Sequence, residues 1–245
     1  MRASIEDAVA IANASRLAMS RLMAVAGHDL KQPLQVAMAS LASAAGDSIS
    51  ADAAGRLRIA LDAMKRLGNE LDDIARLSQA DDAFRPCRRL VRLAEVLTTV
   101  DRDWRFYAEY CGVDLQIHLP EMLVETDPRM LLTILRNLVG NAIKYSGPGG
   151  HVLVLCRTLD SAVSIDVHDD GRGIAAAQLG RIFDAFERGD QADQCHGLGL
   201  GLTIVRQTAN LLQHPVSVRS VENKGTTFSV ELPVPGRYWN MVEDI

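Results

Sequence analysis

A histidine with chemically useful neighbours stands near the N-terminus, in the sequence AGHDLKQPL. His28 is followed by Asp29, and Gln32 lies one helical turn further on, beside Pro33. A carboxylate such as Asp29 can hold one imidazole nitrogen as N–H, which leaves the other nitrogen free to act as a nucleophile. Pro33 removes a backbone donor and loosens the helix at this point. A solvated histidine on a helix is common, so His28 alone is a weak signal.

Two asparagines stand four residues apart in the stretch NLVGNAIKYS. Asn137 and Asn141 therefore share one face of a helix, and Lys144 follows three residues later. Amide oxygens suit a hard cation such as Mg²⁺, especially where phosphates supply the other ligands. The pattern predicts a magnesium and phosphate site, with asparagines that merely decorate an exposed helix as the alternative.

Two glycine-containing segments follow in the second half of the chain. Asp169 and Asp170 precede Gly171 and Gly173, directly after an expected strand, and a buried Asp169 carboxylate could accept a hydrogen bond from an amine such as that of adenine. The two glycines allow close approach of the backbone, although an ordinary turn has the same residues. The sequence GLGLGL at 197–202 opens a helix, whose N-terminal N–H groups favour phosphate. The roughly 20 residues between the segments predict a lid, and the βαβ setting of a dinucleotide fingerprint is missing.

The first 80 residues must place His28. They are rich in alanine and contain one proline, and their apolar residues recur every three or four positions on both sides of a break at 46–50. This period predicts two long amphipathic helices in an antiparallel hairpin. A hairpin alone cannot cover both apolar stripes, so pairing with a second copy into a four-helix bundle is favoured over packing on its own C-terminal domain.

Beyond residue 80 strand-like runs alternate with helical patterns. We expect helices at 94–110, 128–145 and 200–212. We expect strands at 90–93, 113–119, 122–125, 151–158, 162–168, 216–220 and 226–232, with hairpins joining the last two pairs. These elements divide the chain into a helical hairpin at 1–80, a linker at 81–88, an α/β domain at 89–236 and a C-terminal tail at 237–245.

Composition excludes several classes of protein. The 245 residues carry 26 basic and 31 acidic side chains, a net charge of −5, so nucleic acid is not expected as the main partner. No run of 18 apolar residues indicates a transmembrane segment. Four scattered cysteines argue against a disulfide framework or a zinc site, and they suit the reducing cytoplasm. Trp104 and Tyr107 are expected to pack, whereas His118, His151, His168 and His214 are expected at the surface or on strands.

Taken together, these segments resemble the histidine protein kinases of bacterial two-component signalling from about residue 18 to residue 233. In that family's terms, His28 lies in the H box, 137–145 form the N box, 169–174 the G1 box and 197–202 the G2 box. The sequence IFDAFER at 182–188 resembles the F box, and GTTF at 225–228 resembles the last box. The resemblance implies an all-α antiparallel hairpin, a four-helix bundle in the homodimer, followed by the α/β sandwich ATP-binding domain shared with gyrase, Hsp90 and MutL.

The resemblance also implies an activity and a set of site residues. It implies a protein histidine kinase that uses ATP to phosphorylate His28 and passes the phosphoryl group to an aspartate of a response-regulator receiver domain. Asp29 and Gln32 join His28 as implied catalytic residues, and Asn137 and Asn141 would hold Mg²⁺ with the ATP phosphates. The implied ATP-binding residues are Asn137, Asn141, Lys144, Tyr145, Asp169, Gly171, Gly173, Ile174, Gly197, Leu198, Gly199, Leu200, Gly201 and Thr227.

Two departures and two alternatives stay open at this point. Ala185 stands where the F box usually has proline, and Gln32 stands where many members carry threonine or asparagine to orient a water for phosphatase activity. A dimeric phosphotransfer or scaffold protein without ATP turnover is one alternative, and an ATP-driven clamp of the gyrase and Hsp90 kind is the other. The intact nucleotide boxes disfavour the first, and the His28 hairpin disfavours the second. The input is expected from a separate or missing sensor module.

Overall fold

A computed structural model describes residues 86–160, 162–184 and 200–234, together with the single residues 60, 64 and 68. The chain divides into two compact units, Met1–Phe84 and Arg85–Ile245. In the first unit Ala60, Met64 and Gly68 are helical and partly buried, in keeping with the second helix of the expected hairpin. His28, Asp29 and Gln32 lie outside the described residues, so the hairpin stays a prediction.

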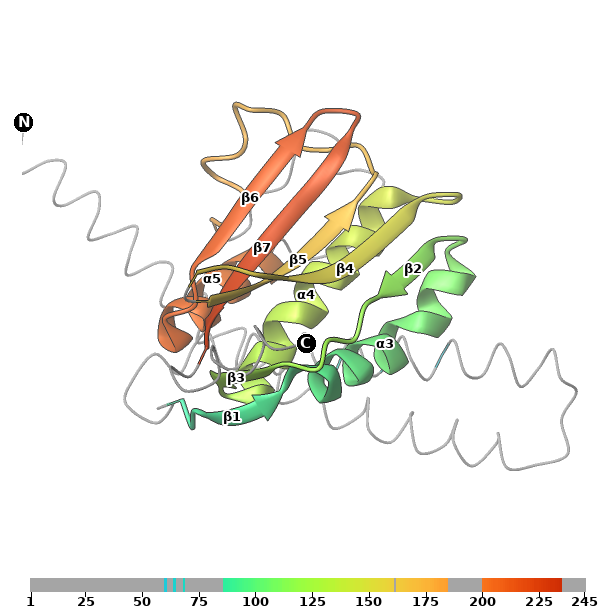
Figure 1. Cartoon of the computed structure of the whole chain (residues 1–245). Coiled ribbons are helices and arrows are strands. Elements are labelled where there is room, and N and C mark those ends of the chain that lie inside the picture. The colour runs from blue at the N-terminus through green and yellow to red at the C-terminus, as the bar shows by residue number, and fades with distance from the viewer. Residues whose placement is uncertain are drawn as a thin grey trace, which may run out of the picture. The chain divides into compact units, whose positions relative to one another are not determined.

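The second unit is built on a five-stranded sheet (Figure 1). Its strand order is β2-β4-β5-β7-β6, in which β2 runs parallel to β4 and all other neighbours are antiparallel. The strands are β2 (Asp114–Ile117), β4 (His151–Thr158), β5 (Ala162–Asp169), β7 (Gly225–Pro233) and β6 (Val216–Val221). A separate antiparallel pair is formed by β1 (Arg89–Arg92) and β3 (Leu123–Thr126).

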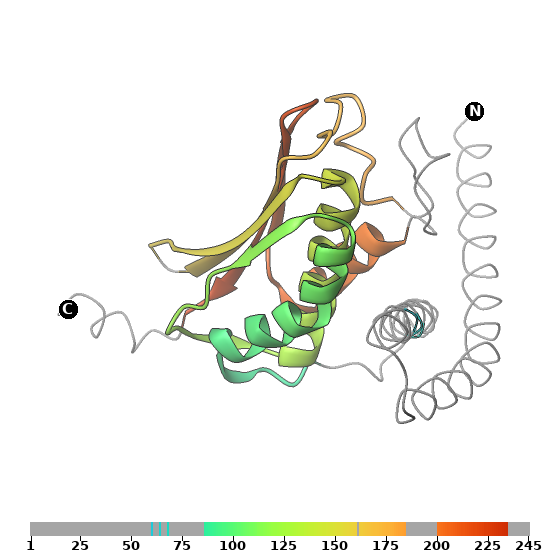
Figure 2. The same ribbon diagram turned by 90° about the vertical axis from the view of Figure 1, so that its right-hand side faces the viewer.

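Three helices cover one face of this sheet, which Figure 2 shows from the side. They are α3 (Leu93–Tyr110), α4 (Pro128–Ser146) and α5 (Gly201–Leu212). Alternate residues of β5, among them Val163, Ile165 and Val167, are buried in the core with the apolar stripe of α4. The α/β sandwich predicted from the sequence is confirmed. No helix among the described residues is both long enough and apolar enough to span a membrane.

The described elements begin and end within two residues of the expected positions. The N-terminus of α4 shows why its position could be predicted from the sequence. The Asp127 carboxylate accepts hydrogen bonds from the N–H groups of Arg129 and Met130 at 3.0 and 3.4 Å, and Pro128 occupies the first turn. Trp104 and Tyr107 pack edge to face with ring centroids 5.8 Å apart, as expected.

His214 is buried, and its predicted surface or strand position is wrong. It follows α5 and is 2% exposed, with its Nε2 atom 2.9 Å from the hydroxyl of Thr126. Burial, together with the nearby Arg88 guanidinium, lowers the pKa of His214 to about 4. The polar stretch Gln213-His214-Pro215 resembles a solvated turn in the sequence, which explains the error.

This burial predicts a specific sensitivity to acid. An unfolded histidine titrates near pH 6.5 and the folded His214 near pH 4, so the unfolded chain takes up the proton first as the pH falls. The free energy of unfolding is therefore expected to fall below pH 6.5, by about 2–3 kcal/mol near pH 4. Urea unfolding can be followed by Trp104 fluorescence in a Trp239→Phe background. Between pH 7 and 5 the free energy of unfolding should fall less in His214→Gln than in the protein that keeps His214. Equal losses in both proteins would contradict the assignment.

Candidate functional site

Asp169 ends β5 with a buried carboxylate, as the sequence predicted. The residue is 4% exposed, and its carboxylate accepts hydrogen bonds from the N–H groups of Gly171, at 3.0 Å, and Thr226. Burial raises the pKa of Asp169 to about 6 in spite of these donors. A carboxylate has about four acceptor positions. It therefore retains the capacity to accept a further hydrogen bond from a ligand.

The loop after Asp169 is wedged between two backbone segments of the protein itself. A Cβ atom on Gly171 would overlap the carbonyl of Tyr145 at the end of α4. Gly173 has a φ of +65°, and a Cβ there would overlap the Val221 carbonyl. The two glycines were expected to allow close approach of the backbone, and the structure shows that other backbone segments of this chain approach them. The loop is thus fixed beside Asp169.

Gly173→Ala is expected to destabilise the domain by about 3 kcal/mol, because a left-handed backbone and an overlap with a carbonyl act together. Gly180→Ala is the matched control, since a Cβ there meets nothing within 4 Å. Thermal unfolding of the two variants would separate the effects. A Gly173→Ala protein as stable as the control would show that the loop is not held as described.

In the last box, Thr226 rather than Thr227 lies beside Asp169. Asp169 of β5 pairs with Thr226 of β7, and His168 pairs with Thr227. Nδ1 of His168 lies 3.0 Å from the hydroxyl of Thr227. Successive residues of a strand point to opposite faces, so the side chain of Thr227 faces away from Asp169. Thr226 is 5% exposed, and its hydroxyl lies 3.0 Å from that of Ser220. Thr226, and not the predicted Thr227, therefore shares the face of the sheet that carries Asp169.

Asp170, to which the sequence assigned no contact, anchors the same loop to the start of β4. Its carboxylate accepts a hydrogen bond from the backbone N–H of His151 at 2.8 Å and lies 2.9 Å from Nδ1 of the same ring. These contacts oppose the effect of burial, and they hold the pKa of Asp170 below its ordinary value. Asp169 and Asp170 thus differ in environment although they are neighbours in the chain.

Asn137 and Asn141 lie beside the first residue of α5. The Asn137 amide donates to the Thr133 carbonyl at 2.9 Å. A Cβ atom on Gly201 would lie 2.8 Å from Oδ1 of Asn137 and 3.9 Å from Nδ2 of Asn141. Glycine at this position therefore leaves room between the two amides and the N-terminus of α5. The structure brings together two segments that are about 60 residues apart in the chain.

The chemistry of these donors fits Mg²⁺ only in combination with a phosphate ligand. Amide oxygens are hard ligands, and the space that a Cβ on Gly201 would fill borders Oδ1 of Asn137 and the side-chain amide nitrogen of Asn141. Among the described residues no cluster of three His, Cys, Asp or Glu side chains could hold a metal ion by itself. The remaining ligands would come from water molecules and the phosphates of a nucleotide.

Two cationic side chains flank the Tyr145 ring near Asp169. The guanidinium of Arg172 lies 4.6 Å from the ring centroid, and Nζ of Lys144 lies 5.2 Å from it. Cations are attracted to the face of an aromatic ring. They bring positive charge to the end of α4, while the expected contact of Lys144 with phosphate stays a prediction.

The described part of the expected lid, up to residue 184, is attached to α5 and β7. Phe183 packs edge to face on Phe228, and its carbonyl accepts a hydrogen bond from the Thr203 hydroxyl at 3.0 Å. Asp184 forms an ion pair with Arg206 at 3.0 Å. Ala185, Gly197, Leu198 and Gly199 lie outside the described residues. Two further expected ATP-binding residues are described: Leu200 is buried, and Ile174 is partly buried against the hydrophobic core.

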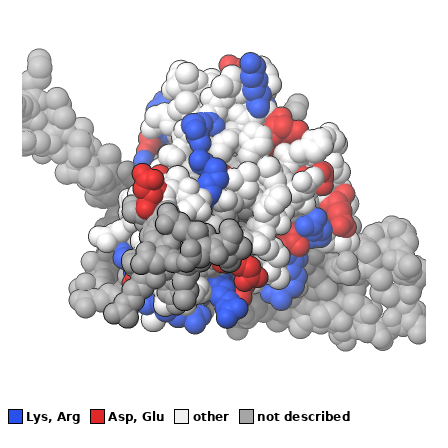
Figure 3. Space-filling model, viewed as in Figure 1, with Lys and Arg blue, Asp and Glu red and all other residues white. Residues whose placement is uncertain are grey.

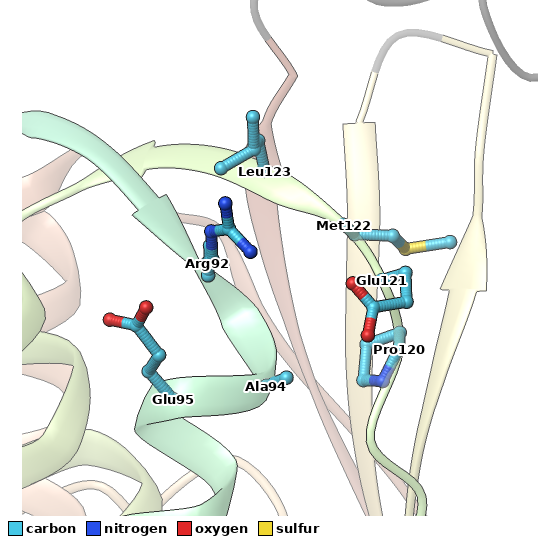
Figure 4. A pocket seen from close by; sticks show the side chains of 7 residues that line it. All are labelled: Arg92, Ala94, Glu95, Pro120, Glu121, Met122 and Leu123. Carbon is cyan, nitrogen blue, oxygen red and sulfur yellow. The ribbon is translucent and has the colours of Figure 1, made fainter.

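The second unit also carries a pocket lined by other residues. A pocket of about 400 Å³ lies by the start of α3 (Figure 4), lined by Arg92, Ala94, Glu95 and residues 120–123, none of them predicted site residues. On the face shown in Figure 3, basic and acidic side chains are interspersed over the described residues.

Comparisons with known proteins agree with this geometry. Residues 126–236 match the family described as histidine kinase-, DNA gyrase B-, and HSP90-like ATPase. The sensor histidine kinase CusS of Escherichia coli O157:H7 is 34% identical over 178 residues, which are 72% of this chain and 37% of CusS. The histidine protein kinase DivJ of Caulobacter vibrioides is 34% identical over 67% of this chain and 28% of DivJ. The chain thus spans about a third of the length of these relatives.

Solved structures show the same fold. Full-length ShkA, crystallised in complex with AMPPNP, superposes with a TM-score of 0.64 over 88% of this chain and 46% of ShkA, at 23% identity. The mycobacterial sensor histidine kinase MprB gives 0.53 over 60% of this chain and 97% of that one, at 25% identity. The chain therefore belongs to the sensor histidine kinases and carries their ATPase domain at residues 126–236.

Proposed function

We propose that this protein is an ATP-dependent autokinase that phosphorylates His28 and passes the phosphoryl group to an aspartate of a response-regulator receiver domain. It would act as a homodimer and receive its input from a sensor module. The observation that carries the proposal is a buried Asp169 carboxylate in the same domain as two asparagines at the N-terminus of α5. The carboxylate suits recognition of a nucleobase, and the two asparagine amides suit a phosphate site.

Asp169 would recognise adenine by accepting a hydrogen bond from its exocyclic amine. The Gly171 and Thr226 N–H groups hold the carboxylate in one orientation, and burial strengthens a hydrogen bond to a charged acceptor. Guanine would place an oxygen where adenine has its amine, and that oxygen would repel the carboxylate. The site should therefore discriminate between the two bases.

The phosphates would lie between Asn137, Asn141 and the N-terminus of α5. N–H groups at a helix N-terminus favour anions, and Lys144 adds a positive charge. Mg²⁺, when bound by the two amide oxygens, neutralises phosphate charge. Phosphoryl transfer depends mainly on such positioning and charge stabilisation.

His28 would attack the γ-phosphorus in line with the bond to the leaving oxygen. The lone pair of one imidazole nitrogen forms the N–P bond, while the bond from phosphorus to the bridging oxygen breaks and ADP keeps its electron pair. Asp29 would orient the ring and take up the proton released from its other nitrogen. The linker at 81–88 would allow the nucleotide to reach His28 and withdraw again.

Calorimetric titration of the full chain tests the nucleotide part of this proposal. We expect ATP to bind at least about tenfold more tightly than GTP, because Asp169 accepts a hydrogen bond from the exocyclic amine of adenine. Removal of Mg²⁺ with EDTA should weaken the binding of ATP but not that of adenosine. A chain that binds neither nucleotide, or that prefers GTP, would overturn the proposal.

A further inference from the structure

Two consecutive residues at the start of the second unit hold the ends of two helices of the candidate site. The backbone N–H of Cys87 donates to the Asp127 carboxylate at 3.0 Å, at the N-terminus of α4. The Arg88 guanidinium donates to the Leu212 carbonyl at 2.6 Å, at the C-terminus of α5, and to the Gln213 side chain at 3.3 Å. The chain therefore enters this unit through contacts with both helices.

The contact of Arg88 places a positive charge at the C-terminus of α5, where the helix has no basic residue of its own. The last carbonyls of a helix have no partners within it and carry partial negative charge. The last turn of α5 contains no basic residue, and Gln213 ends the helix in a left-handed conformation with a φ of 53°. Arg88, 124 residues earlier in the chain, brings a positive charge and a hydrogen-bond donor to this end.

The opposite end of α5 borders the candidate phosphate site. Gly201 begins the helix beside Asn137, and the 12 residues of α5 span about 18 Å to Leu212. One short helix thus joins the segment that enters the unit to the amides that would bind the phosphates. A shift of the helix along its axis would change both contacts together.

We propose that Arg88 is a positioning residue, which couples the segment that enters the ATP-binding unit to nucleotide affinity through α5. The inference rests on the proposed function and extends it to the regulation of the same site. By thermodynamic linkage, a nucleotide at the Gly201 end and the Arg88 contact at the Leu212 end stabilise each other. Movement of the entering segment that withdraws Arg88 therefore weakens nucleotide binding.

The test uses the full chain with Mg²⁺ and AMPPNP as the probe, in the variants Arg88→Ala and Arg88→Lys. Arg89→Ala is the matched control, because the Arg89 side chain is exposed and makes no hydrogen bond or ion pair with the described residues. We expect Arg88→Ala to weaken AMPPNP binding about three- to tenfold, as the loss of a charge-assisted contact at a helix end. Arg88→Lys should restore part of the affinity, and Arg89→Ala should match the wild type.

Hydrogen exchange separates coupling from a merely structural role. Saturating AMPPNP should slow exchange at the Cys87 amide and at residues 210–214 in the wild type and in Arg89→Ala. That protection should be lost in Arg88→Ala even when the site is filled. Unchanged affinity or unchanged protection in Arg88→Ala would overturn the inference while the proposed function stands, whatever the thermal stability of the variant. A wild-type chain that binds no AMPPNP would overturn both.

Discussion

Asp169→Asn is expected to weaken ATP binding at least about 100-fold and, at the same time, to stabilise the folded protein at pH 7. Affinity falls because an amide cannot present two acceptor oxygens, and its buried NH₂ group would face the amine of the base. The Asp169 side chain is 4% exposed, so water cannot replace the lost contact. Calorimetry with Mg²⁺ and ATP measures this part of the prediction.

The gain in stability follows from the sign of the pKa shift. The pKa of Asp169 is raised from 3.8 to about 6, so the folded state holds the proton more tightly than the unfolded chain does. The stability contributed by this group is complete below pH 3.8 and is lost as the pH rises through 6. At pH 7 the buried carboxylate costs on the order of 2–3 kcal/mol, which asparagine removes.

Urea unfolding at pH 7.5 and pH 4.5 tests this sign. The advantage of Asp169→Asn should be large at pH 7.5 and should shrink at pH 4.5. Asp170→Asn is the control with the opposite expectation, because hydrogen bonds lower the pKa of Asp170 and its charge stabilises the fold at neutral pH. A loss of stability in Asp169→Asn at pH 7.5 would contradict the account of a desolvated carboxylate.

Asn141→Ala is the second large effect, and it should slow autophosphorylation by on the order of 100-fold at saturating ATP. The variant removes one of the two side-chain amides beside Gly201, so Mg²⁺ and the phosphates would no longer be held in one arrangement. Because Asp169 can still bind the adenine amine in this variant, the affinity for adenosine should change little. Raising the Mg²⁺ concentration should restore part of the rate.

Asn210→Ala provides the matched control for this effect, since Asn210 is an exposed residue of α5 far along the helix from Gly201. Rates of phosphoryl incorporation at a series of Mg²⁺ concentrations would compare the two variants. Equal rates in Asn141→Ala and Asn210→Ala would remove Asn141 from the site.

The elements of the second unit could be predicted from sequence because their signals are local. The Asp127-Pro128 start of α4 and the alternating residues of β5 act over a few residues, and both were located correctly. The shared face of Asn137 and Asn141 follows from the same local rules and needs no knowledge of the tertiary structure. The burial of Asp169 does not, because an ordinary turn can have the same residues.

The errors concern contacts between segments that are distant in the chain. Thr226 and Thr227 are neighbours in sequence, and only the register of β5 with β7 decides which one faces Asp169. The burial of His214 depends on Thr126, 88 residues away, and the contact of Arg88 depends on Leu212. No periodicity within a single segment carries that information.

The central claim is that His28 receives the γ-phosphoryl group of ATP, and one measurement tests it most directly. Purified wild-type chain and His28→Gln are incubated with γ-labelled ATP and Mg²⁺, and the protein-bound label is measured before and after acid treatment. The account predicts label on the wild type that acid removes, and none on His28→Gln, which still binds ATP. Label that persists in His28→Gln, or that survives acid, would contradict it.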